Sequence, residues 1–427
     1  MQNTYWHNLL ISFLFVIACL GIKAQNEISS PYSGFGIGSL THINAGPLQA
    51  MGGVAYAMQN HYWINFKNPA SYVAFDSLSI LMDASFSIIS GKLVSQNKTQ
   101  QNVIARPNYL LIGLPITRHW RTSIGILPFS SLDYAINDSK TVENIGQIDY
   151  QYRGEGGLYQ LYWGNAFRLF KGFSIGINLS YLFGSKNTIR MAEFVAPNFL
   201  NSRIEDNNQV NGLYLSAGVQ YLIKLKEHHT LGVGVVYENS AYIATSRNLF
   251  VKHYQGSYSS GITYDTVLYT DKGKGIMRIP QSVGGGISYN FKDKIIIGFD
   301  ATRQNWTQYK MNGSKDTMLR NMLLFSAGLQ FTPDPTSGKF GKRINFRIGA
   351  KYSTGYFSVR GTPISEYTVC AGIGLPLRTF NTNASLNIMV EYGQMGTLKN
   401  SLFRQDVLKL TFNFILHEKW YQRVKLE

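Results

Sequence analysis

The sequence predicts an all-β protein: a transmembrane antiparallel β-barrel of about 14 strands with an N-terminal hatch, or plug, segment. Three observations predict it. From residue 76 onward, segments of alternating apolar and polar side chains recur to the end of the chain. Charged residues make up only 15% and aromatic residues 14%, whereas an average soluble domain has about 25% charged residues. The connections between predicted strands also alternate between short and long, as in barrels of the bacterial outer membrane.

The chain begins with a leader of the secretory type. Residues 9–20 form a mostly apolar run, which is shorter than the ~20 residues of a membrane-spanning helix. Such a run fits the apolar part of a signal peptide, and we expect residues 1–24 to be that peptide, although it lacks the usual Lys or Arg at its start. In an alternative interpretation, residues 16–19 form a lipobox that makes Cys19 a lipidated N-terminus.

Residues 25–75 do not have the pattern of barrel wall. They contain the glycine-rich stretch SPYSGFGIGSL and several aromatic residues. An apolar segment of this kind needs a surface to pack against, and the lumen of the barrel offers one. We therefore expect a hatch over residues 25–75 and a barrel over residues 76–427. The alternative, a mobile periplasmic tail, is disfavoured by the aromatic residues.

The stretch FSIGINLSYLF illustrates the expected wall. Because side chains alternate across a strand, Phe173, Ile177 and Leu179 are expected to face lipid, and Gly176 and Asn178 the lumen. Pro128 falls inside a predicted strand, so that strand either carries a bulge or ends earlier. The predicted strands are 76–90, 105–116, 120–135, 148–169, 173–184, 210–224, 230–240, 279–291, 294–303, 319–331, 343–353, 364–375, 384–394 and 406–417.

The longest predicted connection, residues 241–278, is the candidate ligand-contacting loop. Its candidate residues are Arg247, Lys252, Tyr254 and Lys272. Aromatic rings would contact an apolar chain, and the cations would bind a carboxylate. The alternative is a loop that only contacts anionic surface lipid.

Several function classes are disfavoured. The net charge is +16, but no long run of Lys or Arg suggests a nucleic-acid site. With one cysteine in the leader and the other at Cys370, the mature chain has no disulfide framework. His228 and His229 fit a polar turn better than a metal site. The outer-loop candidates Ser240, His253, Asp265 and Asp271 show no nucleophile motif, so neither an enzyme nor a cofactor is expected.

A short motif before the first predicted strand adds a resemblance to a family. Asn68-Pro69-Ala70 resembles the Asn-Pro-Ala motif in the hatch of the FadL family of long-chain fatty-acid and hydrophobic-compound transporters. Residues 51–55 resemble the small-residue segment before that motif. Residues 159–164, 180–184 and 417–420 look like parts of a divergent branch. The resemblance implies that Asn68, Pro69 and Ala70 are hatch residues in a 14-stranded barrel with a binding pocket and a lateral opening.

The resulting hypothesis is an outer-membrane channel for passive uptake of hydrophobic or amphipathic, fatty-acid-like molecules, gated by the hatch. The expected partners are such a ligand and outer-membrane lipid, and no nucleic acid. The alternative function is an accessory or structural outer-membrane barrel that assists a protein secretion complex. A solidly blocked lumen would favour this second function, whereas a lipid-facing gap would favour transport.

Overall fold

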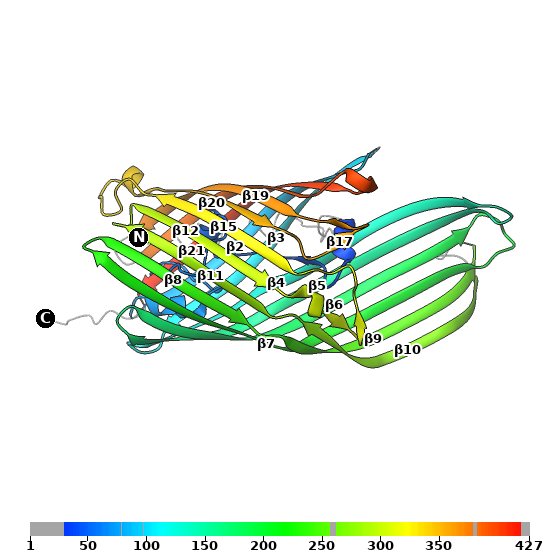
Figure 1. Cartoon of the computed structure of the whole chain (residues 1–427), viewed down its shortest axis with the longest axis horizontal. Coiled ribbons are helices and arrows are strands. Elements are labelled where there is room, and N and C mark those ends of the chain that lie inside the picture. Colours follow the sequence, from blue (N-terminus) through cyan, green and yellow to red (C-terminus); the bar gives the residue numbers. More distant parts are fainter. Residues whose placement is uncertain (1–29, 78, 97, 257–261, 379–381, 420–427) are drawn as a thin grey trace, which may run out of the picture.

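The computed structural model describes residues 30–427 except residues 78, 97, 257–261, 379–381 and 420–427. The predicted signal peptide and Cys19 lie outside the described residues. The fold is a closed antiparallel barrel of 14 wall strands, as predicted (Figure 1). The last strand, β21, pairs with the first, β2, from Ser79↔Lys419 to Val94↔Arg404, and this pairing closes the cylinder.

The wall strands have the following bounds: β2 (Ser79–Val94), β3 (Thr99–Pro115), β4 (Trp120–Val142), β5 (Gly146–Phe170), β6 (Phe173–Phe194), β7 (Asn201–Lys226), β8 (His229–Glu238) with β9 (Ala241–Gln255), β10 (Ile262–Ile279) with β11 (Ser282–Phe291), β12 (Ile295–Gln304), β15 (Met322–Phe331), β16 (Asn345–Ser353), β19 (Glu366–Arg378), β20 (Thr382–Gly396) and β21 (Arg404–Lys419). Strand β7 pairs with β8 over one half and with β9 over the other, so β8 and β9 act as one wall strand. Likewise, β10 continues into β11. Short elements lie in the connections: β13 (Lys310–Met311), β14 (Ser314–Lys315), β17 (Ser358–Val359), β18 (Thr362–Pro363), η3 (Trp306–Gln308), η4 (Phe340–Arg343) and η5 (Lys399–Ser401).

Side chains of β6 alternate between the two faces of the wall as expected. Asn178 and Ser180 are buried in the barrel, whereas Ile177 and Leu179 are 41% and 42% exposed on the outer surface. Of the two alternatives predicted at Pro128, a bulge or an earlier end of the strand, the structure has the bulge, because the β4–β5 register shifts between Pro128 and Ser130. A proline cannot donate to the ladder, and the bulge accommodates it.

Aromatic belts border an apolar band on the outer surface. At one border, Trp120 stacks on Phe167 and Phe170 on Phe173. The other border carries six tyrosines that are 42–49% exposed: Tyr159, Tyr181, Tyr237, Tyr352, Tyr367 and Tyr392. On β5 the band runs from residue 170 to residue 159, close to the ~9–11 residues with which a tilted strand crosses a bilayer. This arrangement is typical of membrane-spanning barrels. Separately, no helix among the described residues is long and apolar enough to cross a membrane.

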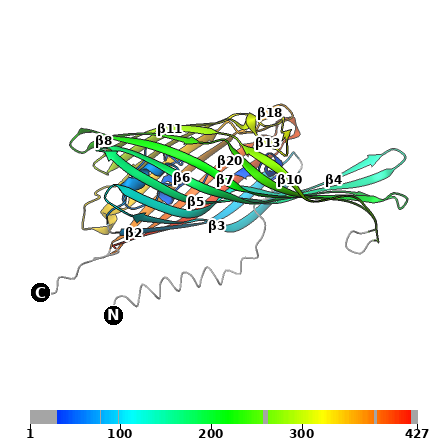
Figure 2. The ribbon, with the colours of Figure 1, turned by 90° about the horizontal axis from the view of Figure 1, so that it is seen from below.

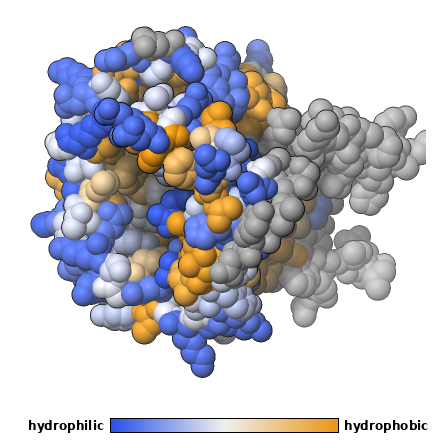
Figure 3. Space-filling view, turned by 90° about the vertical axis from the view of Figure 1, so that its right-hand side faces the viewer, coloured by the Kyte–Doolittle hydropathy of each residue, from blue (hydrophilic) through white to orange (hydrophobic). Residues whose placement is uncertain are grey.

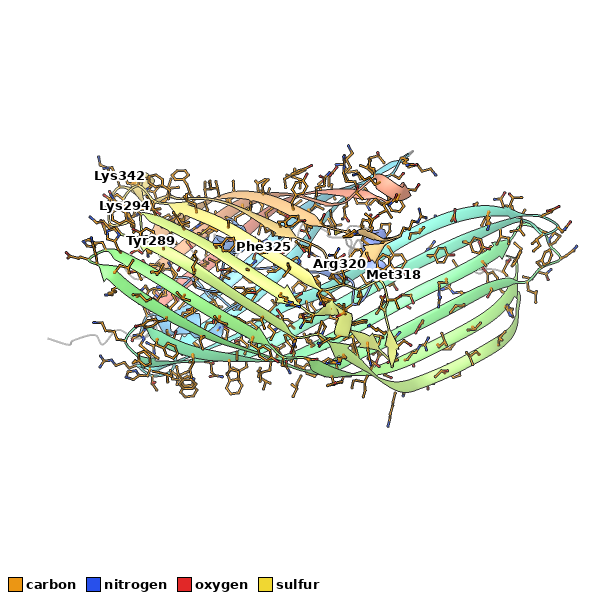
Figure 4. All side chains as sticks on the ribbon, in the orientation of Figure 1. Tyr289, Lys294, Met318, Arg320, Phe325 and Lys342 are labelled. Carbon is orange, nitrogen blue, oxygen red and sulfur yellow. The ribbon has the colours of Figure 1, made fainter. Side chains whose placement is uncertain are left out.

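The connections predicted to be short all lie at one end of the barrel, and those predicted to be long all lie at the other. One end has mostly tight turns, such as 171–172 and 227–228, and the end of β21 lies there. Lys294 and Lys342 mark this turn end in Figure 4, and Met318 and Arg320 lie toward the opposite, loop end. The alternation of short and long connections therefore correctly separates the two ends.

Six neighbouring strands extend far beyond the tyrosine belt and form a curved sheet at the loop end, the flange (Figures 1 and 2). It consists of residues 134–142 of β4, 146–155 of β5, 185–194 of β6, 201–210 of β7, 244–255 of β9 and 262–275 of β10. At ~3.3 Å per residue, β5 continues for about 40 Å beyond Tyr159. The expectation of loops at 136–147, 185–209 and 241–278 is therefore wrong for most of these residues. Their strands carry polar side chains on both faces, so no apolar stripe marks them in the sequence.

Residues 30–75, hereafter the N-terminal segment, lie inside the barrel. The segment contains η1 (Pro31–Gly34), β1 (Ser39–Leu40), α2 (Gly46–Gln49) and η2 (Pro69–Ala74). Leu48, Val54, Ile64 and Tyr72 have no exposed surface. The apolar core of the molecule thus lies between this segment and the inner face of the wall.

Candidate functional site in the barrel lumen

Apolar contacts hold the N-terminal segment to one side of the wall. Ile64, Tyr72 and Phe75 pack with Leu111 of β3 and Tyr162 of β5 in one buried cluster. Burial of an aliphatic or aromatic side chain contributes about 1.5–3 kcal/mol. The cluster therefore holds the last third of the segment firmly at the turn end of the lumen.

Glycines in the wall let the segment lie directly on the strands. Five wall strands each place a glycine where an added Cβ would come closer than 3.0 Å to the segment: Gly176, Gly218, Gly234, Gly328 and Gly349. At Gly349, for example, the obstructing atoms belong to the backbone of Met51 and Gly52. Backbone cannot move aside as a flexible side chain can, so these glycines form a cradle for the segment.

The Asn-Pro-Ala motif lies in this cradle. Asn68 is the N-cap of η2, and its Oδ1 accepts a hydrogen bond from Ala70 N at 3.1 Å. Its Nδ2 donates to Tyr56 O at 2.6 Å and to Val219 O of β7 at 3.2 Å. One buried side chain thus caps a helix, ties two parts of the segment together and joins them to the wall.

Charged groups of the wall bind the backbone of the segment. The Asp300 carboxylate of β12 accepts hydrogen bonds from Ala55 N at 2.6 Å and Tyr56 N at 3.0 Å. On the opposite side, Arg168 of β5 donates to Val73 O at 2.7 Å. Hydrogen bonds to charged groups are worth about 1.5–3 kcal/mol each. Together with the apolar cluster and the cradle, they fill the lumen at this level.

A cavity of about 230 Å³ lies on the loop-end side of the segment. Its lining includes Ile43 and Gln49 from the segment and Ile89, Ile104 and Val407 from the wall. It is smaller than the ~300–1,000 Å³ of typical small-molecule sites. Figure 3 looks onto the loop end of the molecule, where hydrophilic and hydrophobic side chains surround a hollow.

The charged groups of the cavity are partly paired. Lys409 Nζ lies 3.0 Å from Glu391 Oε2, Lys351 Nζ lies 4.0 Å from Glu391 Oε1, and Gln49 Nε2 donates to Glu391 Oε1 at 2.7 Å. Arg106 and Glu366 complete the charged lining within the described residues. Burial lowers the pKa of His42 to about 4, so this lining imidazole is neutral at pH 7. Three cations therefore oppose two carboxylates, a balance that suits an anionic or dipolar group.

Next to the cavity, β3 and β4 are not paired with each other. These strands pair only from Leu110↔Ile126 to Pro115↔Arg121, although both continue toward the loop end. Beyond that point β1 of the N-terminal segment pairs with β4 instead, at Ser39↔Ser131 and Leu40↔Ser130. Residues from both sides of this gap line the cavity, Arg106 from β3 and Ser131 from β4. The cavity thus adjoins a lateral gap whose β4 edge is occupied by β1.

The four residues proposed for ligand contact lie in the flange, away from this cavity. Arg247 Nε and Nη2 bind the Asp206 carboxylate at 2.9 and 2.8 Å, and Tyr254 donates to Glu193 at 2.7 Å. The Lys252 ammonium lies 5.3 Å from the centre of the Phe250 ring. Lys272 interrupts the β9–β10 register, between Thr270 and Gly273. Arg247 and Tyr254 therefore join β9 to other strands, and the four residues do not converge on one pocket.

The residues that surround the cavity come from eight wall strands, the connection between β16 and β19, and the segment, and the sequence gives little sign of them. Lys351, Glu391 and Lys409 lie on three strands that are far apart in the chain, and only the register brings them together. The cradle glycines have a weak signal in the sequence. Gly232 and Gly234 alternate with valines, which indicates a close approach at the inner face.

A titratable contact joins the segment to the wall at the turn end. His61 Nδ1 lies 3.1 Å from Asp76, which also faces His417 Nε2 at 3.5 Å, and Tyr62 packs edge-on against His417. The hydrogen bond to Asp76 raises the pKa of His61 above 6.5, with a further contribution from Asp293. Because the pKa of His61 is higher in the folded chain than in the unfolded chain, protonation of His61 stabilises the contact below pH 6.5. This stabilisation is lost as the pH rises through the folded pKa.

We therefore expect residues 60–63 to exchange amide hydrogens more slowly, relative to intrinsic rates, at pH 6 than at pH 8.5. Hydrogen exchange followed by mass spectrometry measures this difference. Substitution His61→Gln should remove the pH dependence in these residues. If the pH dependence persists in His61→Gln, another group controls the contact.

Comparisons with known proteins agree with this architecture. The BamG family model matches residues 6–427. Among solved structures, the barrel is similar to the CymD monoaromatic hydrocarbon channel (TM-score 0.56, 14% identity, 90% of this chain and 100% of that chain). It is also similar to a Pseudomonas aeruginosa FadL homologue (0.58, 12%, 90% and 100%) and to the Pseudomonas putida toluene transporter TodX (0.58, 13%, 89% and 99%). No curated protein matches at the sequence level. The predicted FadL-like fold is confirmed.

Proposed function

Because this chain belongs to the BamG family and folds as a FadL-like barrel, we propose that it admits small hydrophobic or amphipathic molecules across the outer membrane. The observation that carries this proposal is the 230 Å³ cavity beside the gap between β3 and β4. Similar barrels are described as a monoaromatic hydrocarbon channel and a toluene transporter. A ligand of that size range fits the small cavity better than a long acyl chain does.

In the proposed mechanism the ligand enters sideways, from the lipid, through the gap. Burial of ~100 Å² of apolar surface would contribute about 2.5 kcal/mol. The cations of the cavity would orient an acidic or dipolar end. The N-terminal segment would act as the hatch, because it fills the lumen between the cavity and the turn end. Displacement of β1 from β4 would widen the gap, and movement of the segment would release the ligand toward the periplasm.

A disulfide between β1 and β4 tests this route. Ser39 and Ser131 are register partners, and directly opposed antiparallel residues have Cα atoms about 4.5–5.5 Å apart, within reach of a disulfide. In the Ser39→Cys/Ser131→Cys variant we expect uptake of radiolabelled toluene or oleate to fall to background when oxidised and to recover on reduction. The Ser39→Cys and Ser131→Cys single variants serve as controls. Full uptake by the oxidised double variant would refute a route that requires β1 to leave β4.

A second candidate function, the accessory barrel of a protein complex, is supported by a different observation. The flange stands outside the apolar band, and the lateral route does not require it. The closely seated segment also fits a barrel that is kept sealed. The two functions are compatible, because the cavity and the flange occupy different parts of the molecule.

A further inference from the structure

The flange is a single layer of sheet. Within the described residues, its six strands pair with their neighbours, and neither a helix nor a second sheet packs on the inner face toward the tip. Sheets of this size normally bury one face against another element. Along β5 the flange is about 33 Å long, and its part toward the tip is thus a candidate surface for another molecule.

The inner face of the flange, which continues the lumen face, carries a continuous row of side chains across all six strands. Strand registers place them directly opposite one another in the order Ile136, Tyr152, Arg190, Ile204, Val251 and Leu268. Five of the six are apolar, and all are exposed or half-exposed. Tyr150 stacks beside Tyr152 with ring centres 6.4 Å apart and widens the apolar surface. We call this row the flange stripe.

Arg190 lies at the centre of the stripe. It is exposed and forms no ion pair with any residue that the structure describes. Its neighbours in the row, Tyr152 and Ile204, are apolar or aromatic. Tyrosine and arginine, surrounded by side chains that exclude water, are typical of the residues that dominate protein–protein binding energy.

The opposite face of the same strands carries apolar side chains such as Ile189 and Phe250, and several of its charged groups are paired. There Asn187 donates to Glu155 at 3.0 Å, and Arg203 lies 2.5 Å from Glu205. Arg153 is exposed on this face next to Tyr152. The charged and amide groups named on the outer face thus bind one another. On the inner face, Arg190 has no ion-pair partner among the described residues and can bind a group of another molecule.

We propose that the flange stripe docks a second protein, which places a carboxylate on Arg190 and apolar side chains on the flanking residues. At ~4.8 Å per strand the six strands span about 24 Å, which suits a protein surface better than a small ligand. The stripe lies beyond the tyrosine belt, so lipid chains do not reach it. A second copy of this chain fits poorly, because a symmetric contact through the stripe would bring two Arg190 side chains together. This inference rests on the second candidate function and not on transport.

Charge reversal on each face of β5 and β6 tests the proposal. We would purify the full-length protein in mild detergent from its native outer membrane, as wild type, Arg190→Glu and Arg153→Glu. The expected result is a stoichiometric protein partner with wild type and with Arg153→Glu, and at least about tenfold less with Arg190→Glu, because the introduced glutamate would face and repel the partner's carboxylate. The variant Tyr152→Ala should also lose the partner.

A photo-cross-linking residue placed at Tyr152 or at Arg153 in otherwise unchanged protein gives a second measurement. Cross-links to the same partner from position 152, and not from position 153, are expected. Retention of the partner by Arg190→Glu, or equal cross-linking from both faces, would show that the flange stripe is not the docking surface. The accessory role would then still stand. Absence of any stoichiometric partner would overturn both the stripe and the accessory role. Cross-links only to a second copy or to lipopolysaccharide would assign the surface to that occupant and overturn the proposal.

Discussion

Deletion of residues 30–75 is expected to convert a sealed barrel into an open pore. The wall closes through β2 and β21 without help from the segment, so the cylinder should still assemble. The segment occupies the lumen between the cavity and the turn end, where Leu48, Val54 and Ile64 have no exposed surface. Without it, water would reach buried polar wall groups such as Asp300 and solvate them. Liposomes with the shortened barrel should therefore swell rapidly in small sugars, whereas liposomes with the full chain should swell at the rate of protein-free liposomes.

Two controls make this result interpretable. The shortened protein must keep the strand content and the resistance to unfolding in cold detergent that an assembled barrel shows. A deletion outside the lumen, such as shortening of the β4–β5 hairpin at residues 136–152, should leave the leak unchanged. An assembled barrel without residues 30–75 that still excludes sugars would mean that other parts of the chain seal the lumen.

The architecture of the wall was largely predictable from the sequence, because lipid imposes a simple rule on each strand. Every residue of β6 from Phe173 to Leu179 lies on the face that its polarity indicates. Pro128 indicated a bulge or an earlier strand end for the same local reason, since it lacks an N–H. In both cases one residue and its immediate neighbours carry the information.

Features that depend on register could not be predicted in this way. The flange strands lie outside the apolar band, so residues 185–194 have no lipid-facing stripe and resemble a loop. Lys351, Glu391 and Lys409 meet only because β16, β20 and β21 align in the wall. The gap between β3 and β4 arises because β1, a two-residue strand, takes the place of β3 on β4. Nothing local in the sequence marks such a short strand.

The resemblance implied that Asn68, Pro69 and Ala70 are hatch residues, and the structural surroundings of Asn68 allow a sharper prediction. Substitution Asn68→Ala should weaken docking of the segment by about 3 kcal/mol. Loss of an N-cap side chain costs about 0.5–2 kcal/mol, and each further hydrogen bond contributes about 0.5–1.5 kcal/mol. Here the N-cap bond to Ala70 N and the bonds from Asn68 Nδ2 to Tyr56 O and Val219 O are all lost, although Tyr56 O keeps its bond from Gln220 Nε2. A change of this size corresponds to about a 100-fold larger undocked population.

Hydrogen exchange over residues 55–75 measures this population, and Asn60→Ala is the matched control. Asn60 belongs to the same segment, but its side chain only accepts a bond from Tyr62 N near the surface, so its substitution should change exchange within about 0.5 kcal/mol. The variant Asn68→Asp separates the contributions, because aspartate keeps the acceptor for Ala70 N but cannot donate to Tyr56 O or Val219 O. If Asn68→Asp behaves like wild type, the cap alone matters; if it behaves like Asn68→Ala, the bonds to the segment and the wall carry the stability. Equal exchange in Asn68→Ala and Asn60→Ala would show that the motif does not hold the segment, and would leave that role to Asp300, Arg168 and the glycine cradle.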